Sequence, residues 1–489
     1  MDKLVRGIKT YKGIALSFFT SFKDPKGIDT YKRIGAITFP AFIELFLISL
    51  KGIVDMLMVS RISIAAIAGV GLTNQPFFLL IAIFNAINVG TTTLVSWNIG
   101  KGDKAKASAI TRQAIIFNFV LGGVLSALGF FGAQYFMPLM IDDAQVAAYA
   151  TRYLEIICLG LAFNAVAMGI TAALRGAGET KIPMIYNLCG NGLHIILNYM
   201  LIFGNLGMPR LEVTGAAIST TLARTFTALI AIGVLVFWKR SPLRIKLRDS
   251  WRLNTKTVKD IFAIGMPSAG EQFVIQSGLL VFTRIIASLG AQAVAAHHIA
   301  ININMIAFSV SQAFSISNTA LVGRACGADD YPLAERYTIF ARRLARIITA
   351  VITVNFIIWA GHIIGLYTYD PIVIAYGIPV FYFMAATQYV QSSQMCTAGA
   401  LRGSGDAMYP FYASIVGIWG LRIALAALFI FVLGWGVWGA WAAFFIDQSG
   451  RSIVVKRRFS SGKWKEMKAV REERMRKREQ RLEGACGRK

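Results

Sequence analysis

Charged residues are scarce in this sequence, and their scarcity excludes an ordinary soluble protein. Only 15% of the 489 residues are Asp, Glu, Lys or Arg, whereas 56% are hydrophobic. Soluble domains usually carry about a quarter charged residues. Apolar stretches of about 20 residues, the length needed to cross the hydrocarbon of a bilayer, recur along the chain, for example at residues 34–50, 114–137 and 347–367. We therefore predict an all-α membrane protein without a sizeable domain outside the membrane.

Cysteine and histidine are also few, which argues against an enzyme. The five cysteines are far apart in the sequence and lack the close spacing of a metal site. The sequence has no Gly-Lys-Ser or Gly-Lys-Thr loop for nucleotide phosphates, and no clustered metal or nucleophile signature of an enzyme is apparent. We expect a protein that is not an enzyme, needs no cofactor and binds no metal other than a possible coupling ion.

Acidic residues are half as numerous as basic ones, which gives a formal net charge of +25. In a soluble protein this charge would suggest nucleic acid, but most Lys and Arg lie in alternate loops and in the terminal segments. These segments are residues 1–33, 97–112, 175–181, 239–260, 323–346 and 451–489. By the positive-inside rule they are cytoplasmic. We expect a multi-pass protein of the cell (plasma or inner) membrane with both termini cytoplasmic, in contact with membrane lipids and without nucleic-acid partners.

Twelve transmembrane helices satisfy this charge pattern. They are residues 34–58, 64–96, 113–137, 146–174, 182–204, 213–238, 261–285, 293–322, 347–367, 372–401, 410–432 and 437–455. They divide the chain into a cytoplasmic or interfacial N-terminal segment (1–33), an N-terminal six-helix bundle (34–238), a cytoplasmic linker (239–260), a C-terminal six-helix bundle (261–455) and a basic cytoplasmic tail (456–489).

The two predicted bundles are repeats of each other. An offset of 227 residues superposes five pairs without a gap: Pro40 and Pro267, Glu44 and Glu271, Gly100 and Gly327, Arg175 and Arg402, and Pro183 and Pro410. Each half has six spans, an even number, so both halves enter the membrane in the same direction. Two such pseudo-symmetric bundles enclose a central cleft, and rocking one against the other opens it alternately to either side.

Six motifs resemble the multidrug and toxic compound extrusion (MATE) transporters of the larger flippase-like superfamily. They are Pro40 with IVDMLMVS (53–60), FNAVAMGITAALRGAGETKIPM (163–184), LNYMLIFG (197–204), TGAAISTT (214–221), GMPSAGEQ (265–272) and ALRGSGD (400–406). The resemblance covers about residues 30–455. It implies a twelve-helix exporter driven by an ion gradient.

The first span carries Glu44, Lys51 and Asp55 on one helical face, since they are separated by seven and four residues. Ionisable residues at membrane depth are costly unless they are paired or face a wet cavity, so each is a functional candidate. One interpretation is a self-neutralising Lys51–Asp55 pair. The other is a carboxylate whose proton or cation occupancy changes during transport. The resemblance implies the second role for Asp55, and Glu44 is a further coupling candidate because it is an acid at membrane depth.

The fifth span carries a polar seam of Asn187, Asn191, His194 and Asn198. These side chains either hydrogen-bond neighbouring helices, a common use of Asn in membranes, or line a cavity. The resemblance implies a coupling role for His194 and Asn198, together with Thr220 in the sixth span. It also implies a possible Na+ site at Asp55, Asn198 and Thr220. Many family members have Asn and Asp at the two seam positions, and the missing acid favours proton coupling through His194.

The C-terminal half offers Glu271, one turn after Pro267, as a second coupling carboxylate or as a structural group that closes the backbone opened by proline. Family acids in the seventh and tenth spans are replaced by Ile275 and Gln391, so those sites do not carry over. We expect a substrate cleft lined by polar side chains. These are Asn164, Asn191, Gln272, Gln276, Asn302, Gln388 and Gln391.

Four further charged positions are interpreted as structural. Asp447 and Arg451 in the last span stand four residues apart near its cytoplasmic end, which is typical of a pair that reaches toward the membrane surface. Arg175 and Arg402, in the repeated Leu-Arg-Gly turns, are expected to anchor cytoplasmic loops.

The leading hypothesis is a monomeric secondary exporter that antiports lipophilic, cationic small organic compounds against protons or sodium ions by alternating access. It requires Asp55 and Glu271 to face the wet cleft. A lipid-linked saccharide flippase of the same superfamily is the alternative, which would need basic side chains facing inward, and a membrane enzyme ranks third.

Overall fold

The computed structural model describes residues 25–141, 143–238, 241–246 and 248–473, and these residues form helices without a β-strand. The helices before the central linker are α2 (Pro25–Val59), α3 (Ile64–Gly100), α4 (Lys104–Met140), α5 (Ala144–Leu159), α6 (Leu161–Gly176), α7 (Lys181–Phe203) and α8 (Glu212–Phe237). Those after the linker are α9 (Thr255–Ala287), α10 (Ala291–Gly327), α11 (Tyr331–Gly365), α12 (Pro371–Gly403), α13 (Met408–Ile415), the π-helix η1 (Val416–Ile423), α14 (Ala424–Ala427), the π-helix η2 (Leu428–Val432), α15 (Gly436–Ser460) and the 3-10 helix η3 (Lys463–Glu466).

These elements make the twelve predicted spans. Among the described residues, seven spans are long and apolar enough to cross a membrane by themselves, and α5 with α6, which meet at 51°, form an eighth. The other four are α2, α7, α9 and α15, and they carry the intramembrane acids and the polar seam. Large apolar side chains such as Phe131 and Ile358, 67% and 66% exposed, cover the outside of the molecule, as lipid contact requires.

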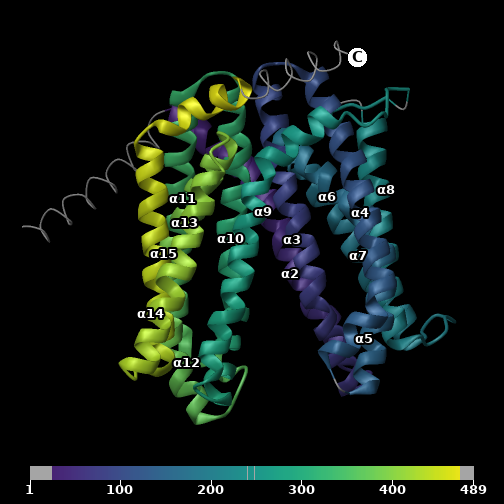
Figure 1. Cartoon of the computed structure of the whole chain (residues 1–489), viewed down its shortest axis with the longest axis vertical. Coiled ribbons are helices and arrows are strands. Elements are labelled where there is room, and N and C mark those ends of the chain that lie inside the picture. The colour runs from purple at the N-terminus through teal and green to yellow at the C-terminus, as the bar shows by residue number, and fades with distance from the viewer. Residues whose placement is uncertain (1–24, 142, 239–240, 247, 474–489) are drawn as a thin grey trace, which may run out of the picture.

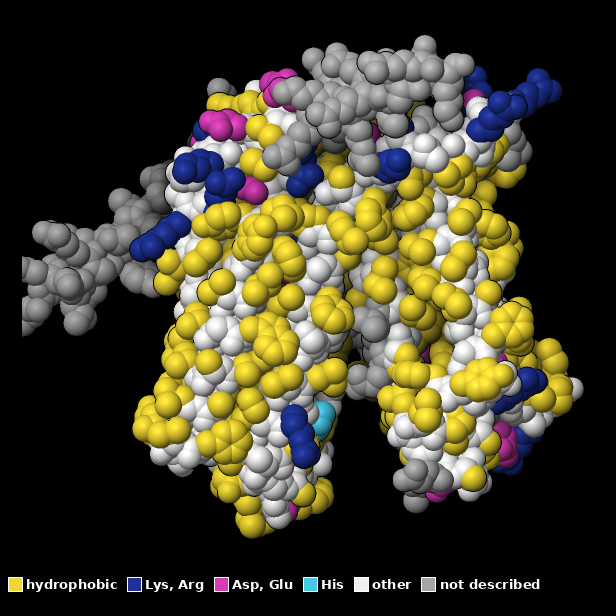
Figure 2. All heavy atoms as spheres, in the orientation of Figure 1, with side chains coloured by type: hydrophobic (Ala, Val, Ile, Leu, Met, Phe, Trp, Pro, Cys, Tyr) yellow, Lys and Arg dark blue, Asp and Glu magenta, His cyan; other side chains and the backbone are white. Residues whose placement is uncertain are grey.

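The spans form two lobes, α2–α8 and α9–α15, that lie apart at one end and together at the other (Figure 1). At the closed end α3 packs against α9 and α10, and α10 packs against α2. Figure 2 shows the hollow between the lobes and its opening at the opposite end. Most Lys and Arg side chains of this face lie at the closed end, where α3, α6, α10 and α12 terminate; we call it the basic end. The predicted fold of two six-helix bundles around a central cleft is confirmed.

Glycine lets the lobes approach closely at the basic end. Gly100 at the end of α3 and Gly327 at the end of α10 are equivalent in the repeat. A Cβ atom on Gly100 would overlap the carbonyl oxygen of Arg324, and one on Gly327 would overlap that of Trp97. Each glycine thus lies against the backbone of the other lobe.

The segments outside the bundles are only partly helical, since linker residues 241–246 and 248–254 form turns and irregular chain. Residues 25–33 belong to α2, whereas residues 1–24 of the predicted N-terminal segment and 474–489 of the predicted tail lie outside the described residues. Within the linker, Asp249 forms an ion pair with Arg112 of α4 at 2.5 Å. The backbone N–H of Lys246 and the Arg112 guanidinium hold the pKa of Asp249 below its ordinary value. The predicted division of the chain into five segments stays a prediction.

Candidate functional site

Asp55 of α2 meets the polar seam of α7 inside the N-terminal lobe. Asn198 Nδ2 donates a hydrogen bond of 2.8 Å to Asp55 Oδ1, and His194 Nδ1 lies 3.2 Å from the same oxygen. On its other side, His194 Nε2 lies 3.0 Å from Thr220 Oγ1 of α8. The side chain of Asp55 is 29% exposed, whereas His194, Asn198 and Thr220 are buried. The structure therefore brings together the four residues that the resemblance grouped.

This network can hold two protonation states with the same heavy-atom positions. The Thr220 hydroxyl lies 3.0 Å from the carbonyl oxygen of Ala216 and from His194 Nε2, and it can donate to only one of them. If it donates to His194, the neutral imidazole carries its proton on Nδ1, which lies 3.2 Å from the deprotonated Asp55 Oδ1 without hydrogen-bond geometry. If it donates to Ala216, His194 Nε2–H donates to Thr220, and one additional proton is shared between His194 Nδ1 and Asp55. Rotation of one hydroxyl thus lets the site gain or lose a proton.

Two basic side chains lie in the same part of the lobe. Lys51 and Arg224 are close enough for their charges to act on the Asp55 carboxyl group. The Arg224 guanidinium stacks on the ring of Phe77 at 4.3 Å. Among the described residues, the nitrogen within ion-pair distance of Asp55 is His194 Nδ1, which is charged only when protonated, and Lys51 forms no direct ion pair with this carboxylate. The structure shows no direct Lys51–Asp55 contact, since the α7 side chains lie against Asp55 Oδ1, but the two charges still act on each other.

Glu44 is held by partners on two other helices. Arg175 Nη2 of α6 donates to Glu44 Oε2 at 2.8 Å, and Asn187 Nδ2 of α7 donates to Glu44 Oε1 at 2.7 Å. The carboxylate is 3% exposed. It is therefore a buried, paired charge that ties three helices of the lobe together.

Glu271 has the same arrangement in the C-terminal lobe. Arg402 Nη2 donates to Glu271 Oε2 at 2.7 Å, and the Ser414 hydroxyl donates to Oε1 at 3.2 Å. All three residues stand 227 positions after Glu44, Arg175 and Asn187. Glu271 is buried, so the expectation that it faces the open cleft is wrong, because Arg402 covers it. Arg175 and Arg402 are not loop anchors, and the repetition of both members of each pair was the signal that could have revealed their pairing.

A third buried carboxylate, Asp447 of α15, binds two arginines. Arg422 Nε and Nη2 donate to Asp447 Oδ2 at 2.9 and 2.6 Å, and Arg451 Nε and Nη2 donate to Oδ1 and Oδ2 at 2.9 and 3.0 Å. Asp447 and Arg451 do form the predicted pair, but neither reaches the membrane surface, since they are 0% and 6% exposed. Their close approach to η1 requires Gly417, where a Cβ atom would overlap Asp447 Oδ1.

Comparison with known proteins decides the family. The family model MatE matches residues 40–200 and 267–428, which are the two halves of the internal repeat. The chain belongs to the MATE family. It is a membrane transporter and not an enzyme, as predicted. MatE matches each lobe separately, in agreement with the internal repeat of this chain.

Relatives of the chain extend over nearly its full length. An uncharacterized transporter, YisQ of Bacillus subtilis, is 32% identical over 91% of this chain and 97% of the relative. A probable multidrug resistance protein NorM of Thermotoga maritima is 29% identical over 91% and 95%. The multidrug resistance protein PmpM of Pseudomonas aeruginosa is 26% identical over 87% and 90%.

Solved structures of the family share the fold. A MOP superfamily transporter from Pyrococcus furiosus, described as having a binding pocket of reversed polarity, superposes with a TM-score of 0.83 at 21% identity, covering 90% of this chain and 97% of that one. An outward-facing multidrug resistance MATE transporter superposes with a TM-score of 0.83 at 22% identity, covering 89% of this chain and 97% of that one. These likenesses establish the twelve-helix fold of this MATE chain.

The polar residues expected to line the substrate cleft of this MATE protein differ in exposure. Gln388 and Gln391 of α12 are buried, at 0% and 6% exposure, and Asn302 of α10 is exposed. The remaining four are half-buried: Asn164, Asn191, Gln272 and Gln276. Within the described part of the chain, both amide atoms of Gln388 lack a hydrogen-bond partner. Their assignment to the cleft stays a prediction.

Proposed function

We propose that this MATE chain is a secondary multidrug exporter that antiports lipophilic, cationic organic compounds against protons by alternating access. The relatives NorM and PmpM are named a probable multidrug resistance protein and a multidrug resistance protein. The coupling is supported by the geometry at Asp55. A proton and a substrate exchange if each prefers a different state of the cleft, because binding one then weakens binding of the other.

The observation that carries this proposal is the contrast between Asp55 and three other intramembrane acids of the described helices. Glu44, Glu271 and Asp447 are each bonded to Arg and are 4% exposed or less. Asp55 is 29% exposed, and an amide and an imidazole lie against its carboxylate. A carboxylate held by Arg stays charged, whereas one held by His194 and Asn198 can exchange a proton with water.

Proton coupling is favoured over sodium coupling by two features of the site. His194 Nδ1 lies against Asp55 Oδ1, so one carboxylate oxygen faces a nitrogen that can share a proton. Lys51 and Arg224 add two positive charges nearby, which oppose a second, permanently charged cation. The possible Na+ site of Asp55, Asn198 and Thr220 is therefore the less favoured assignment.

Efflux from proteoliposomes tests the proposal. Purified protein is reconstituted, loaded with a fluorescent lipophilic cation, and its release is measured under a pH gradient, a sodium gradient or neither. We expect release to follow the pH gradient and to fall to the protein-free level in Asp55→Asn. Glu155→Gln, which alters an exposed ion pair with Arg152 at 3.4 Å in the same lobe, is the matched control. Equal gradient-driven release from wild type and Asp55→Asn would reject the mechanism.

A second candidate, the flipping of lipid-linked saccharides, is favoured by the two bases beside Asp55. Lys51 and Arg224 are half-buried, and phosphate oxygens are good acceptors for such groups. A fluorescent lipid-linked saccharide moved across the same proteoliposomes, without release of the lipophilic cation, would favour this function over drug export.

The orientation, membrane and assembly follow as proposals. The basic end is cytoplasmic by the positive-inside rule, so the hollow of Figure 2 opens to the outside. The described chain begins and ends at the basic end, in agreement with two cytoplasmic termini. We propose that the protein functions as a monomer in the cell membrane, because each chain contains both lobes.

A further inference from the structure

We propose that residues 463–473 form a strap that fastens the two lobes together at the basic end and detaches when the cleft opens on that side. This strap consists of η3 and the helical turns at 467–473 that follow α15. It rests on the proposed alternating access. It assigns Lys468 and Glu472 a gating role, although both lie outside the bundles and far from Asp55.

The strap is anchored to the C-terminal lobe by a buried lysine and a buried tryptophan. Lys468 Nζ donates to the carbonyl oxygens of Cys326 and Gly327 at 2.7 and 3.3 Å and pairs with Asp329 Oδ1 at 2.7 Å. Its side chain is 5% exposed. The ring of Trp464, which is 0% exposed, stacks on Phe459 with 5.0 Å between centroids. The carbonyls that accept from Lys468 belong to the last turn of α10, where a cation is favourable.

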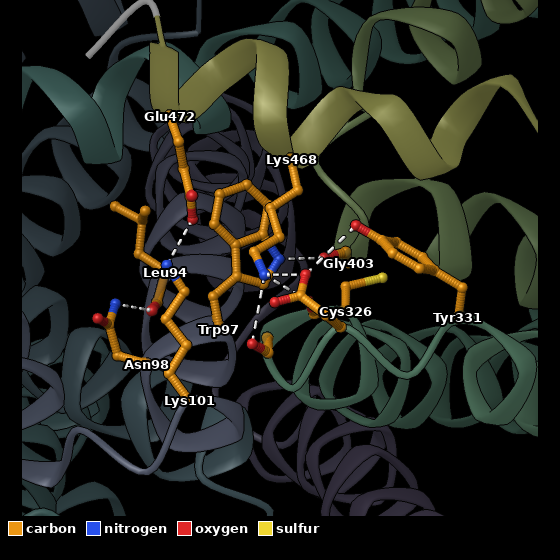
Figure 3. Close-up of polar contacts among 11 residues, drawn as sticks. Leu94, Trp97, Asn98, Lys101, Cys326, Tyr331, Gly403, Lys468 and Glu472 are labelled. Carbon is orange, nitrogen blue, oxygen red and sulfur yellow. Dashed lines mark hydrogen bonds and ion pairs between the residues drawn. The ribbon is translucent and has the colours of Figure 1, made fainter. Parts of the chain in front are cut away.

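The same strap reaches the N-terminal lobe four residues later. Glu472 Oε1 pairs with Lys101 Nζ at 2.7 Å, and Lys101 caps the end of α3. Lys468 and Glu472 project from one helical face. Figure 3 shows them extending from the strap toward Cys326 on one side and Lys101 on the other. One short helix therefore bonds to the ends of α3 and α10, which belong to different lobes.

The strap lies over the contact that keeps this end closed. Trp97 Nε1 of α3 donates to the carbonyl oxygen of Gly403 in α12 at 2.8 Å, which joins the two lobes directly. Arg471 Nε donates to the next turn, at the Gly405 carbonyl, at 2.5 Å. Gly405 lies against the Trp97 ring so closely that a Cβ atom would overlap it. Separation of the lobes here must break the Trp97–Gly403 bond and the Lys101–Glu472 pair together.

The Lys101–Glu472 pair is the part of the strap that crosses between lobes, and a second ion pair in the same segment does not. Lys465 Nζ pairs with Glu335 Oε1 of α11 at 2.8 Å, so both partners belong to the C-terminal side. The two pairs have similar lengths and exposure. Breaking the Lys101–Glu472 pair should favour opening of the basic end, whereas breaking the Lys465–Glu335 pair should not.

Accessibility of Cys326 reports the opening. This cysteine is buried beneath Lys468 (Figure 3) and should become reactive only when the basic end opens. The full chain is prepared in nanodiscs with the other four cysteines replaced by serine, and the rate of maleimide labelling is measured. We expect Lys101→Glu and Glu472→Lys each to raise the rate about two- to fivefold, the population change that an exposed ion pair supports. The double variant Lys101→Glu/Glu472→Lys should return to the parent rate.

Three results would overturn the strap. They are labelling unchanged in both single variants, no rescue in the charge-swapped double variant, and a similar increase in Lys465→Glu, which would indicate simple loosening of the segment.

Lys468→Met, which removes the bonds to two carbonyls, should raise the labelling rate of Cys326 more than either charge reversal. Amide hydrogen exchange of residues 93–103 and 322–330 in the natural cysteine background gives a second measurement. Labelling needs neither substrate nor an ion gradient, so failure of the strap is distinguishable from failure of antiport.

Discussion

Asn198 donates a 2.8 Å hydrogen bond to Asp55, and this bond joins the first span to the fifth inside the N-terminal lobe. The same oxygen of Asp55 lies 3.2 Å from His194. The carboxylate is thus held by groups that are neutral or change charge by one proton, while other buried acids in the spans are held by arginine. This difference makes Asp55 the position at which coupling is expected.

Replacing His194 tests whether the imidazole selects the proton. In His194→Asn the site keeps a polar side chain but has no ring nitrogen to share a proton with Asp55. We expect export driven by a pH gradient to fall at least tenfold and any response to a sodium gradient to rise, because an amide oxygen adds a ligand for a hard cation. Efflux from proteoliposomes measures both. His362→Asn, at an exposed position in α11, is the control, and an unchanged response of His194→Asn to the pH gradient would exclude this role.

Breaking the Glu44–Arg175 ion pair tests its structural role. Arg175→Met leaves the Glu44 carboxylate buried without its cation, which should cost roughly 3–5 kcal/mol of stability. The double variant Glu44→Gln/Arg175→Met removes both charges and should lose much less than the sum of the single changes. Thermal unfolding in detergent measures the differences in stability. The equivalent variants of the C-terminal lobe, Arg402→Met and Glu271→Gln/Arg402→Met, should show the same pattern. Additive losses would mean that the pair does not act as a unit.

Gly417 tests the packing around Asp447. A Cβ atom there would overlap Asp447 Oδ1 and the Arg451 side chain, so Gly417→Ala should destabilise the protein by roughly 1–3 kcal/mol. Gly420→Ala is the matched control in the same π-helical stretch, because the nearest atom to its added Cβ is 3.9 Å away. Thermal unfolding of both variants checks the prediction. Equal stability of the two variants would show that the network tolerates displacement.

The sequence predicted the twelve helices well, because hydrophobic length and alternating basic loops report membrane crossings directly. Predicted span 182–204 is α7, Lys181–Phe203, and predicted span 213–238 is α8, Glu212–Phe237. The lengths of helices were underestimated where they extend beyond the membrane. Helix α11, for example, begins at Tyr331 and not at residue 347. Hydropathy does not detect those polar turns.

The partners of the buried acids were the main failure of the sequence analysis. Glu44 and Arg175 are 131 residues apart, and Glu271 and Arg402 have the same separation. A helical projection of one span shows its own face but not the helix opposite. The pairing of Arg422 with Asp447 was not predicted for the same reason, since the two residues lie on different spans, η1 and α15.

The Asp55 cluster was predicted by resemblance and local spacing together. The seam at His194 and Asn198 is one α-helical turn long, so both residues face the same way. The fold was needed to show that these two residues face α2, the span that carries Asp55. Physical reasoning from the sequence alone left open whether Asp55 pairs with Lys51. In the structure His194 Nδ1 lies against the Asp55 carboxylate instead.

Proton release on substrate binding tests the central claim most directly. A lipophilic cation is added to purified protein in weakly buffered solution, and the pH change is followed with a soluble indicator. If Asp55 exchanges a proton for substrate, wild type releases up to one proton per bound molecule and Asp55→Asn releases none, although Asp55→Asn must still bind the compound in a separate titration. Release of the same number of protons by both proteins would contradict the account.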